Sequence, residues 1–369
     1  MSHTRTVSGT PTVSVVMAAY NGAALIGETL ASLRDQSLPD WEAIVVDDGS
    51  SDATRDVVAA WPDSRVRLIA LPQNGGPVRA RNEALRHATG RYVAGLDQDD
   101  LCRPDRFAAQ VAFLESHPDI ALVGTAVEFL RDGRVLPSTY PPITSPALTG
   151  WLAWIENPLA WSSVMVRGEV ARALDPFTRP DILYAEDFDL YHRVAPFGGI
   201  ARLDAPLVRY RQHAGGISRR YRDRMEASAT EVLAARHAAL LGKRAEAAAR
   251  ALVVHNMGGR AVRDRATLAL LGGVLAQLRD AYLAETRPGE ADRRLIHWHT
   301  ADRWARIGRT ALREGTLTLA DMAAMRHGPL GSPAPAAPAW SRLVGAARNL
   351  GLQTLAAKII RPGPSRANT

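Results

Sequence analysis

Hydrophobic and polar residues follow two different periods along the first hundred residues. Short apolar runs rich in Val and Ile predict strands at 13–19, 43–46, 66–70 and 92–96. Apolar residues at helical spacing between these runs predict helices near 23–36, 52–61 and 77–88. Strands that alternate with helices form parallel sheets covered on both faces. The pattern therefore predicts an α/β, Rossmann-like, mostly parallel sheet with helices on both faces.

The pattern changes along the remainder of the chain. Mixed signals predict strands at 120–123, 164–166 and 200–211 and a helix at 186–195. A stretch rich in Ala, Leu and Arg follows, with few strand signals, and it ends at the Pro/Ala/Gly-rich segment GPLGSPAPAAP. We predict a flexible N-terminus at 1–10, an α/β domain at 11–220, a helical region at 221–327, a linker at 328–338, and a tail at 339–369 that could hold a short helix.

Composition and charge limit the classes of protein. The 369 residues include one cysteine, Cys102, so no intrachain disulfide can form. The long uncharged run at 135–155 is interrupted by prolines, so no stretch reads as a membrane span and we expect a cytoplasmic protein. The net charge of +7 is uneven, because residues 221–369 hold 23 Lys and Arg against 12 Asp and Glu. Such an excess of positive charge has two interpretations. It is typical of solvated, arginine-rich helices, which is the interpretation we favour, and it is also typical of a surface that binds an anionic partner such as a membrane or nucleic acid.

Three aspartates, Asp97, Asp99 and Asp100, follow the predicted strand at 92–96. Like charges repel unless a cation is present, and Mg²⁺ is commonly shared between carboxylates and substrate phosphates. Asp97 and Asp99 point the same way if the strand continues through them. The alternative is a polar loop in which one aspartate caps a helix beginning near Pro104, and Asp100 suits that role. We therefore predict Asp97 and Asp99 as metal ligands.

A second acidic pair, Asp47 and Asp48, ends the predicted strand at 43–46. An acidic residue at this place in an α/β sheet commonly accepts hydrogen bonds from a ribose or a base, although helix capping explains the polar residues that follow. The ends of parallel strands share one edge, which places Tyr20 and Asp48 beside the three aspartates. The chain has no dinucleotide fingerprint, phosphate-binding loop, paired-cysteine zinc spacing or serine-hydrolase motif.

Two further candidates lie in the mixed region. Glu186 and Asp187 open the predicted helix at 186–195, where acids stabilise the helix dipole, and the same placement keeps Asp187 ionised, as a general base requires. His213 follows the last predicted strand, and a single histidine is more often structural than a ligand.

Taken together, these segments resemble the family 2 glycosyltransferases, which have the GT-A fold. The resemblance covers about 200 residues in the family's order and ends near residue 220. It is carried by VSVVMAAYN at 13–21, VVDDGSSD at 45–52, NGGPVRARNEAL at 74–85, GRYVAGLDQDD at 90–100, AEDFDL at 185–190 and YRQH at 210–213.

The resemblance implies a role for each candidate. On the donor side it implies nucleotide contacts from five residues, Ala18, Tyr20, Asp48, Arg81 and Asp97. It implies a bound Mg²⁺ or Mn²⁺ held by Asp97, Asp99 and His213. On the acceptor side, Glu186 would contact the sugar or acceptor and Asp187 would be the catalytic base.

The implied reaction is an inverting transfer from a nucleoside diphosphate sugar, most commonly a uridine diphosphate sugar, to a glycan or lipid-linked acceptor. Processive members carry Q-x-x-R-W, whereas the nearest string here, Thr300–Trp304, lacks the glutamine, so we expect single additions. The alternatives are a nucleotidyltransferase and a non-catalytic sugar-nucleotide-binding scaffold with a helical partner-binding arm. The basic C-terminal part motivates an expected peripheral contact with the inner face of the membrane, and we expect no nucleic acid partner.

Overall fold

A computed structural model describes residues 9–137, 141–213, 221–324 and 329–330. It divides into two compact units, an α/β unit of residues 1–153 and 157–232 and a helical unit of residues 154–156 and 233–369. Residues 1–8 of the predicted flexible N-terminus, most of the predicted linker and the whole predicted tail lie outside the described residues. The predicted domain boundaries stay a prediction.

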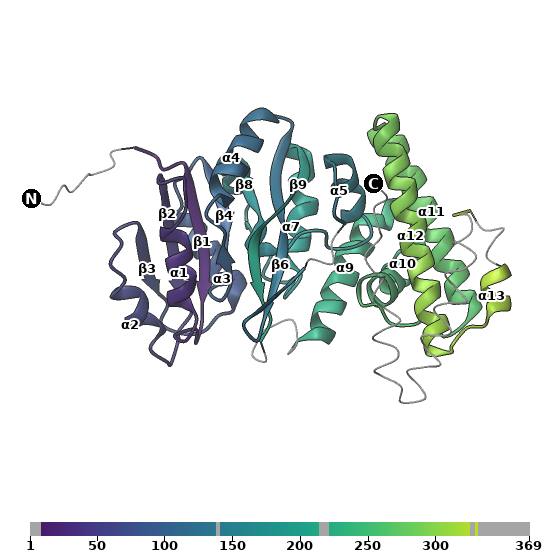
Figure 1. The fold of residues 1–369 in the computed structure, drawn as a ribbon, viewed down its shortest axis with the longest axis horizontal. Coiled ribbons are helices and arrows are strands. Elements are labelled where there is room, and N and C mark those ends of the chain that lie inside the picture. The colour runs from purple at the N-terminus through teal and green to yellow at the C-terminus, as the bar shows by residue number, and fades with distance from the viewer. Residues whose placement is uncertain (1–8, 138–140, 214–220, 325–328, 331–369) are drawn as a thin grey trace, which may run out of the picture. The chain divides into compact units, whose positions relative to one another are not determined.

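The α/β unit is built on a nine-stranded sheet with the order β3-β2-β1-β4-β8-β6-β9-β5, in which β7 pairs with β6 (Figure 1). The strands are β1 (Val13–Ala19), β2 (Trp41–Asp47), β3 (Val66–Ala70), β4 (Tyr92–Gly95), β5 (Leu101–Cys102), β6 (Ile120–Arg131), β7 (Arg134–Leu136), β8 (Met165–Arg167) and β9 (Gly199–Arg211). Strands β3, β2, β1 and β4 are parallel, β8 is antiparallel to both β4 and β6, and β6 pairs in parallel with β9. The predicted α/β class is confirmed.

Helices connect these strands and cover the sheet. They are α1 (Ile26–Arg34), α2 (Thr54–Ala59), α3 (Pro77–His87), α4 (Arg106–Ser116), α5 (Pro146–Ala153), α6 (Gly168–Ala173) and α7 (Glu186–Val194), with short 3₁₀ turns η1 (Trp161–Ser163) and η2 (Ala195–Phe197). β1 and β2 are buried along almost their whole length, which is expected of central strands covered on both faces. The polar loops that follow these strands therefore leave the core at one edge.

One glycine allows two of these loops to meet. Gly49, directly after β2, has a φ of +75°, and a Cβ atom there would lie 2.6 Å from the backbone nitrogen of Asn74. A residue with a side chain would be strained in this conformation and would collide with backbone. Gly49 thus lets the loop after β2 pack against the segment that leads into α3.

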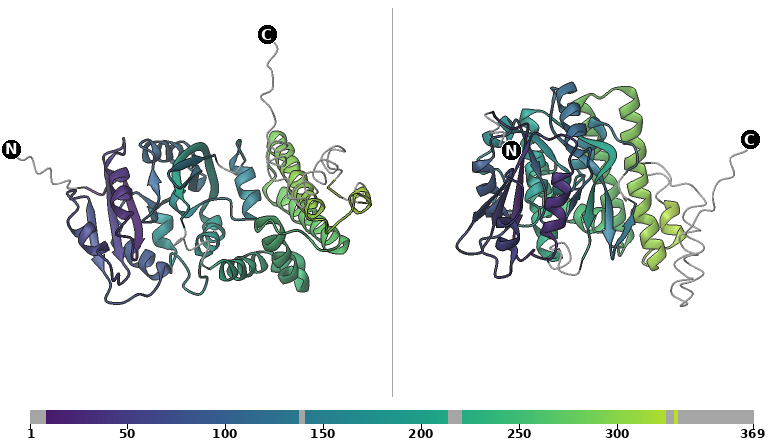
Figure 2. Two further views of the ribbon diagram at one scale, coloured as in Figure 1. Left: turned by 60° about the horizontal axis from the view of Figure 1, so that its bottom comes forward. Right: turned by 60° about the vertical axis from the view of Figure 1, so that its left-hand side comes forward.

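The described part of the helical unit contains helices and no strands, as predicted. The division between the units falls inside α9 (Arg222–Leu241), and the later helices are η3 (Gly242–Arg244), α10 (Ala245–Ala251), the π-helix η4 (Leu252–Met257), α11 (Arg265–Thr286), α12 (Glu290–Glu314) and α13 (Leu319–Ala324). The two longest, α11 and α12, pack side by side (Figure 2). Asp264 caps α11 by accepting a hydrogen bond from the backbone N–H of Thr267 at 2.7 Å.

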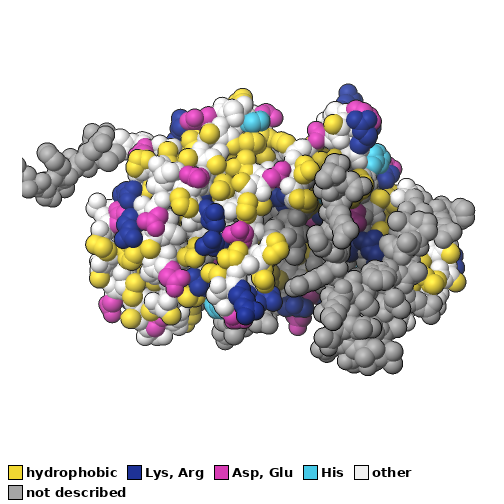
Figure 3. Space-filling model, in the orientation of Figure 1, with side chains coloured by type: hydrophobic (Ala, Val, Ile, Leu, Met, Phe, Trp, Pro, Cys, Tyr) yellow, Lys and Arg dark blue, Asp and Glu magenta, His cyan; other side chains and the backbone are white. Residues whose placement is uncertain are grey.

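Within the described residues, none of the helices has both the length and the apolar composition that a membrane span requires. The surface of the α/β unit seen in Figure 3 carries acidic and basic side chains interspersed with one another. In that view neither sign of charge forms a continuous surface over this unit.

Candidate active site

The loops after β1, β2 and β4 lie next to one another at the carboxyl edge of the parallel strands. Tyr20 and Gln98 exchange two hydrogen bonds, from the Tyr20 N–H to Gln98 Oε1 at 3.0 Å and from Gln98 Nε2 to the Tyr20 carbonyl at 2.9 Å. The Asn21 N–H donates to Ser50 Oγ at 3.0 Å. Three loops that are distant in sequence thus form one rim, as the strand order predicts.

Two residues predicted to contact the nucleotide belong to β1 and its end. Tyr20 is 46% exposed at this rim, so its ring is available to a ligand. Ala18 lies in β1 opposite Val46 of β2. The contacts described for these two residues do not test their predicted role in nucleotide binding.

Asp48 is buried and has both carboxylate oxygens engaged. It accepts hydrogen bonds from the backbone N–H groups of Gly75 at 2.9 Å and Gly76 at 2.7 Å. These bonds shape the loop that precedes α3. Asp48 therefore lies at the predicted edge, and its observed contacts are to the loop of residues 75–76.

Arg81, on α3, connects two carboxylates that are far apart in sequence. Its guanidinium is hydrogen bonded to Asp97 at 2.9 Å and to Glu186, and it lies over the ring of Trp161 at 4.6 Å from the centroid. Burial alone would lower the pKa of Arg81, but the negative charges of Asp97 and Glu186 raise it instead. Arg81 therefore stays charged and holds the two carboxylates together.

Asp99, the second of the three aspartates that follow β4, pairs with His213. His213 Nε2 lies 2.8 Å from Asp99 Oδ2, and both side chains are partly exposed. Burial raises the pKa of Asp99, the neighbouring Asp97 charge raises it further, and His213 acts in the opposite direction. Burial and the Asp97 charge thus outweigh the effect of His213 on the pKa of Asp99.

The contacts of Asp100 correct one interpretation of the sequence. α4 begins at Arg106, and Asp100 does not cap it. Asp100 Oδ1 instead accepts the backbone N–H of Arg211 at 2.8 Å, and the Arg211 side chain donates to the Asp99 carbonyl at 2.8 Å. β9 therefore holds the acidic loop in place, and capping was the wrong explanation for Asp100.

The donor set suits a hard divalent cation in its chemistry. It offers carboxylate oxygens from Asp97 and Asp99 and an imidazole nitrogen from His213. β4 ends at Gly95, so the strand alternation that would aim Asp97 and Asp99 the same way does not reach them. Over the described part of the chain, no three His, Cys, Asp or Glu side chains are grouped closely enough to hold a metal ion unaided. A cation here would need further ligands from a bound substrate.

Glu186 and Asp187 lie in the first turn of α7, where their charges complement the helix dipole. Glu186 is buried, and its Oε2 atom has no hydrogen-bond partner within the described residues, as is also true of Nε of Arg81. Asp187 is partly exposed and therefore reachable by a substrate.

The surroundings of Asp187 change its acidity. Burial, and next the adjacent Glu186 charge, raise the pKa of Asp187 to about 6, while a hydrogen bond from Asn157 at 3.1 Å and the charge of Arg81 act to lower it. A carboxylate with such a pKa is ionised at neutral pH and is a stronger base than an ordinary aspartate.

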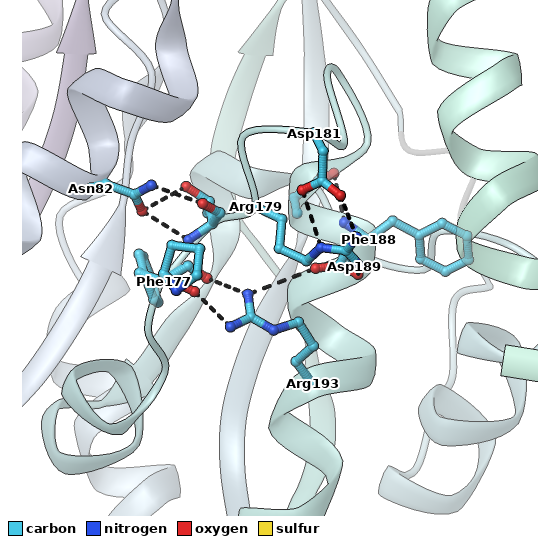
Figure 4. A network of polar contacts seen from close by, with 10 residues as sticks. Asn82, Phe177, Arg179, Asp181, Phe188, Asp189 and Arg193 are labelled. Carbon is cyan, nitrogen blue, oxygen red and sulfur yellow. Dashed lines mark hydrogen bonds and ion pairs between the residues drawn. The ribbon is translucent and has the colours of Figure 1, made fainter. Parts of the chain in front are cut away.

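A polar network aligns the helices that carry these groups (Figure 4). Asn82 of α3 exchanges hydrogen bonds with the backbone of Thr178, each at 2.8 Å. The same segment accepts a hydrogen bond from Arg193 of α7 to the Phe177 carbonyl at 3.0 Å, and Arg179 pairs with Asp189 at 3.4 Å. α3 and α7 are thus both attached to residues 177–179, which orients Arg81 toward Glu186.

The structure therefore brings together Arg81, Asp97 and Glu186 by direct contact, with Asp187 beside Glu186, and it pairs Asp99 with His213. Sequence reasoning missed Asn157, Trp161 and Gln98, which contact site residues or the adjoining loop. No local pattern distinguishes them, because their partners are 30 or more residues away.

Comparison with known proteins gives three consistent results. The family model described as "Glycosyl transferase family 2" matches residues 14–171. The chain is 37% identical over 208 residues to "UDP-Glc:alpha-D-GlcNAc-diphosphoundecaprenol beta-1,3-glucosyltransferase WfgD" of Escherichia coli, covering 56% of this chain and 79% of that protein. It is 29% identical over 213 residues to "Amylovoran biosynthesis glycosyltransferase AmsE" of Erwinia amylovora, covering 56% and 79%.

Among solved structures, residues 1–349 of S. aureus TarS are similar in fold. The TM-score is 0.51 at 20% sequence identity, over 82% of this chain and 91% of that chain. This likeness concerns the fold alone.

Proposed function

Because the chain belongs to the family 2 glycosyltransferases, we propose that it moves a sugar from a nucleoside diphosphate sugar to an acceptor hydroxyl with inversion. The observation that carries the proposal is the bridge from Asp97 through Arg81 to Glu186, beside Asp187. The bridge connects the acidic loop assigned to the donor with the acidic helix turn assigned to the acceptor.

Asp187 is the proposed base. Its carboxylate takes the proton of the acceptor hydroxyl, the oxygen attacks the anomeric carbon, and the bond to the nucleoside diphosphate breaks. A single displacement inverts the anomeric centre and needs no protein nucleophile. The partial exposure of Asp187 and its pKa of about 6 support this role.

The donor is proposed to bind along the rim formed by the loops after β1, β2 and β4. The exposed ring of Tyr20, with Ala18 beside it, would flank the base, and Asp48 and Asp97 would serve the base or ribose, with Arg81 holding Asp97. Asp48 would also contribute indirectly, because it holds the loop of Gly75 and Gly76 in place through two hydrogen bonds. The name of WfgD supports a uridine diphosphate sugar.

A divalent cation, Mg²⁺ or Mn²⁺, is proposed to be held by Asp97, Asp99 and His213 together with oxygens of the bound diphosphate. When bound, such an ion supplies positive charge that neutralises the leaving diphosphate. The raised pKa of Asp99, caused by burial and by the charge of Asp97, supports a cation at this position.

The acceptor is proposed to be a growing glycan or a lipid-linked sugar, with Glu186 contacting it. Two observations support this choice: the lipid diphosphate in the name of WfgD, and the Glu186 Oε2 atom, for which the described part of the chain supplies no hydrogen-bond partner. The basic excess of residues 221–369 motivates a peripheral contact with an anionic membrane. Flotation with vesicles of phosphatidylglycerol at low salt tests that contact, and protein that stays at the bottom of the gradient would reject it.

The central experiment incubates the purified protein with UDP-glucose, UDP-galactose or UDP-N-acetylglucosamine, Mn²⁺ and a synthetic α-GlcNAc-diphosphate-alkyl acceptor. We expect UDP release with a matching glycosylated product, and loss of both in Asp187→Asn. Asp280→Asn is the control, because it makes the same change at an exposed, arginine-paired carboxylate of the helical unit. Pyrophosphate release would indicate a nucleotidyltransferase, and tight sugar-nucleotide binding without turnover would indicate a scaffold.

A further inference from the structure

Asn157 is the only side chain seen to donate a hydrogen bond to Asp187 among the described residues. Its Nδ2 donates to Asp187 Oδ2 at 3.1 Å, while its Oδ1 accepts the backbone N–H of Leu159 at 3.4 Å. The Leu159 contact fixes which end of the amide faces Asp187, because the two ends have opposite hydrogen-bonding character.

The other oxygen of Asp187 is also engaged. Asp187 Oδ1 accepts the N–H of Phe188, its neighbour in α7, at 2.7 Å. The carboxylate is thus fixed at both ends, by its own helix and by Asn157. The remaining influences on its pKa are burial and the charge of Glu186, which raise it, and the charge of Arg81, which lowers it. Asn157 adds a neutral donor that favours the ionised form.

The chain that leads into Asn157 is itself fixed. Residues 154–156 belong to the helical unit, where Ile155 is fully buried. Glu156 pairs with Arg303 of α12, whose Nε lies 3.0 Å from Glu156 Oε2. Asn256 Nδ2 donates to the same oxygen and to the Ile155 carbonyl, each at 3.1 Å.

The aromatic residue at the start of this segment is held as firmly. Trp154 meets the ring of Tyr282 edge-on at 5.2 Å between centroids, and Arg236 lies 4.1 Å from the Trp154 ring centroid. His237 Nε2 lies 2.7 Å from the Trp154 carbonyl oxygen. Helices α9, α11 and α12 and the π-helix η4 therefore hold residues 154–156 within the helical unit.

We propose that Asn157 is a positioning residue for the proposed base Asp187. This inference rests on the proposed function. Asn157 sets the orientation of the Asp187 carboxylate and favours its ionised form. The competing explanation is that Asn157 only stabilises its own turn through Leu159.

The test compares Asn157→Ala and Asn157→Asp with the wild-type protein in the transfer assay with the α-GlcNAc-diphosphate-alkyl acceptor, from pH 5 to pH 8. Loss of a hydrogen bond to a charged group typically changes an equilibrium or rate constant by a factor of about ten or more. We therefore expect kcat to fall about ten-fold in Asn157→Ala. We expect an unchanged KM for the sugar nucleotide and an acidic limb of the kcat profile that moves to higher pH. Asn157→Asp keeps the shape but adds a like charge, and we expect a larger shift in the same direction.

Gln277→Ala is the matched control, because it removes a side-chain amide hydrogen bond, to Arg244, at an exposed site of the helical unit. A melting temperature measured for each variant separates misfolding from mispositioning. An Asn157→Ala protein with lower thermal stability but a wild-type pH profile and kcat would overturn the inference. A wild-type protein that turns over no sugar nucleotide would instead refute the proposed function, so the two failures are distinguishable.

Discussion

Replacing Asp187 with asparagine is expected to stabilise the folded protein at neutral pH while it abolishes turnover. Burial, followed by the Glu186 charge, raises the pKa of Asp187 from 3.8 to about 6. At about 1.36 kcal/mol for a tenfold change in acidity, the ionised carboxylate costs the folded state at most about 3 kcal/mol. Asparagine avoids this cost, although its amide would face the amide of Asn157 and lose about 1 kcal/mol. The expected net gain is about 2 kcal/mol.

The sign of this effect depends on pH. The folded-state pKa lies above the unfolded value, so Asp187 destabilises the wild-type protein progressively as pH rises through the range from 3.8 to about 6. The advantage of Asp187→Asn should therefore be larger at pH 7.5 than at pH 5, by about 1 kcal/mol or roughly 3 °C in melting temperature.

Thermal unfolding of both proteins, followed by circular dichroism at the two pH values, measures this difference. Asp181→Asn is the control, because Arg179 lowers the pKa of the exposed Asp181 and the same substitution should bring no gain that grows with pH. A melting-temperature difference for Asp187→Asn that is the same at pH 5 and pH 7.5 would refute the reasoning.

Three further predictions test the site. The rate of sugar transfer should rise with pH around an apparent pKa near 6 and then level off, because Asp187 must be ionised to act as a base. A rate that is constant from pH 5 to pH 8 would exclude Asp187 as the base. Arg81→Met should lower the free energy of unfolding, measured by chemical denaturation, by about 3–5 kcal/mol, because it leaves two carboxylates without their shared cation. A decrease below about 1 kcal/mol would contradict the proposed bridge from Asp97 through Arg81 to Glu186. Chelation with EDTA should abolish transfer, and Asp99→Asn should need more Mn²⁺ than the wild type for half-maximal rate; equal requirements would remove Asp99 from the metal site.

The strands and helices of the first hundred residues could be predicted because their signals are local. The runs at 13–19 and 66–70 predict the bounds that β1 and β3 have. The helix predicted at 186–195 appears as Glu186–Val194. The antiparallel placement of β8 between β4 and β6 has no such signal, because strand order depends on packing rather than on the sequence of each strand.

The residue types of the site could be predicted, whereas their partners could not. Acidic pairs at strand and helix ends indicate chemistry from the sequence alone. The contact between Arg81 and Glu186 joins residues 105 positions apart, and nothing in either segment specifies it. Asn157 contacts Asp187, which lies 30 positions later in the chain, and nothing in its own segment specifies that contact. Such positions follow only from the folded structure.

The acidic residues of the site can lie close together because hydrogen bonds or ion pairs offset their negative charges. Asp97 and Glu186 share the guanidinium of Arg81, Asp99 has His213, and Asp100 accepts the backbone N–H of Arg211. Within the described residues, both Asp100 and Asp187 receive hydrogen bonds from neutral donors only, and burial raises the pKa of each. Asp100 is almost fully buried, whereas Asp187 is partly exposed and has a pKa of about 6. A carboxylate with a full ion pair would be too weak a base to take a proton from a hydroxyl. The lack of a paired cation together with partial exposure thus distinguishes Asp187 from the other acids, which is why a neutral asparagine, and not a second arginine, suits the position beside Asp187.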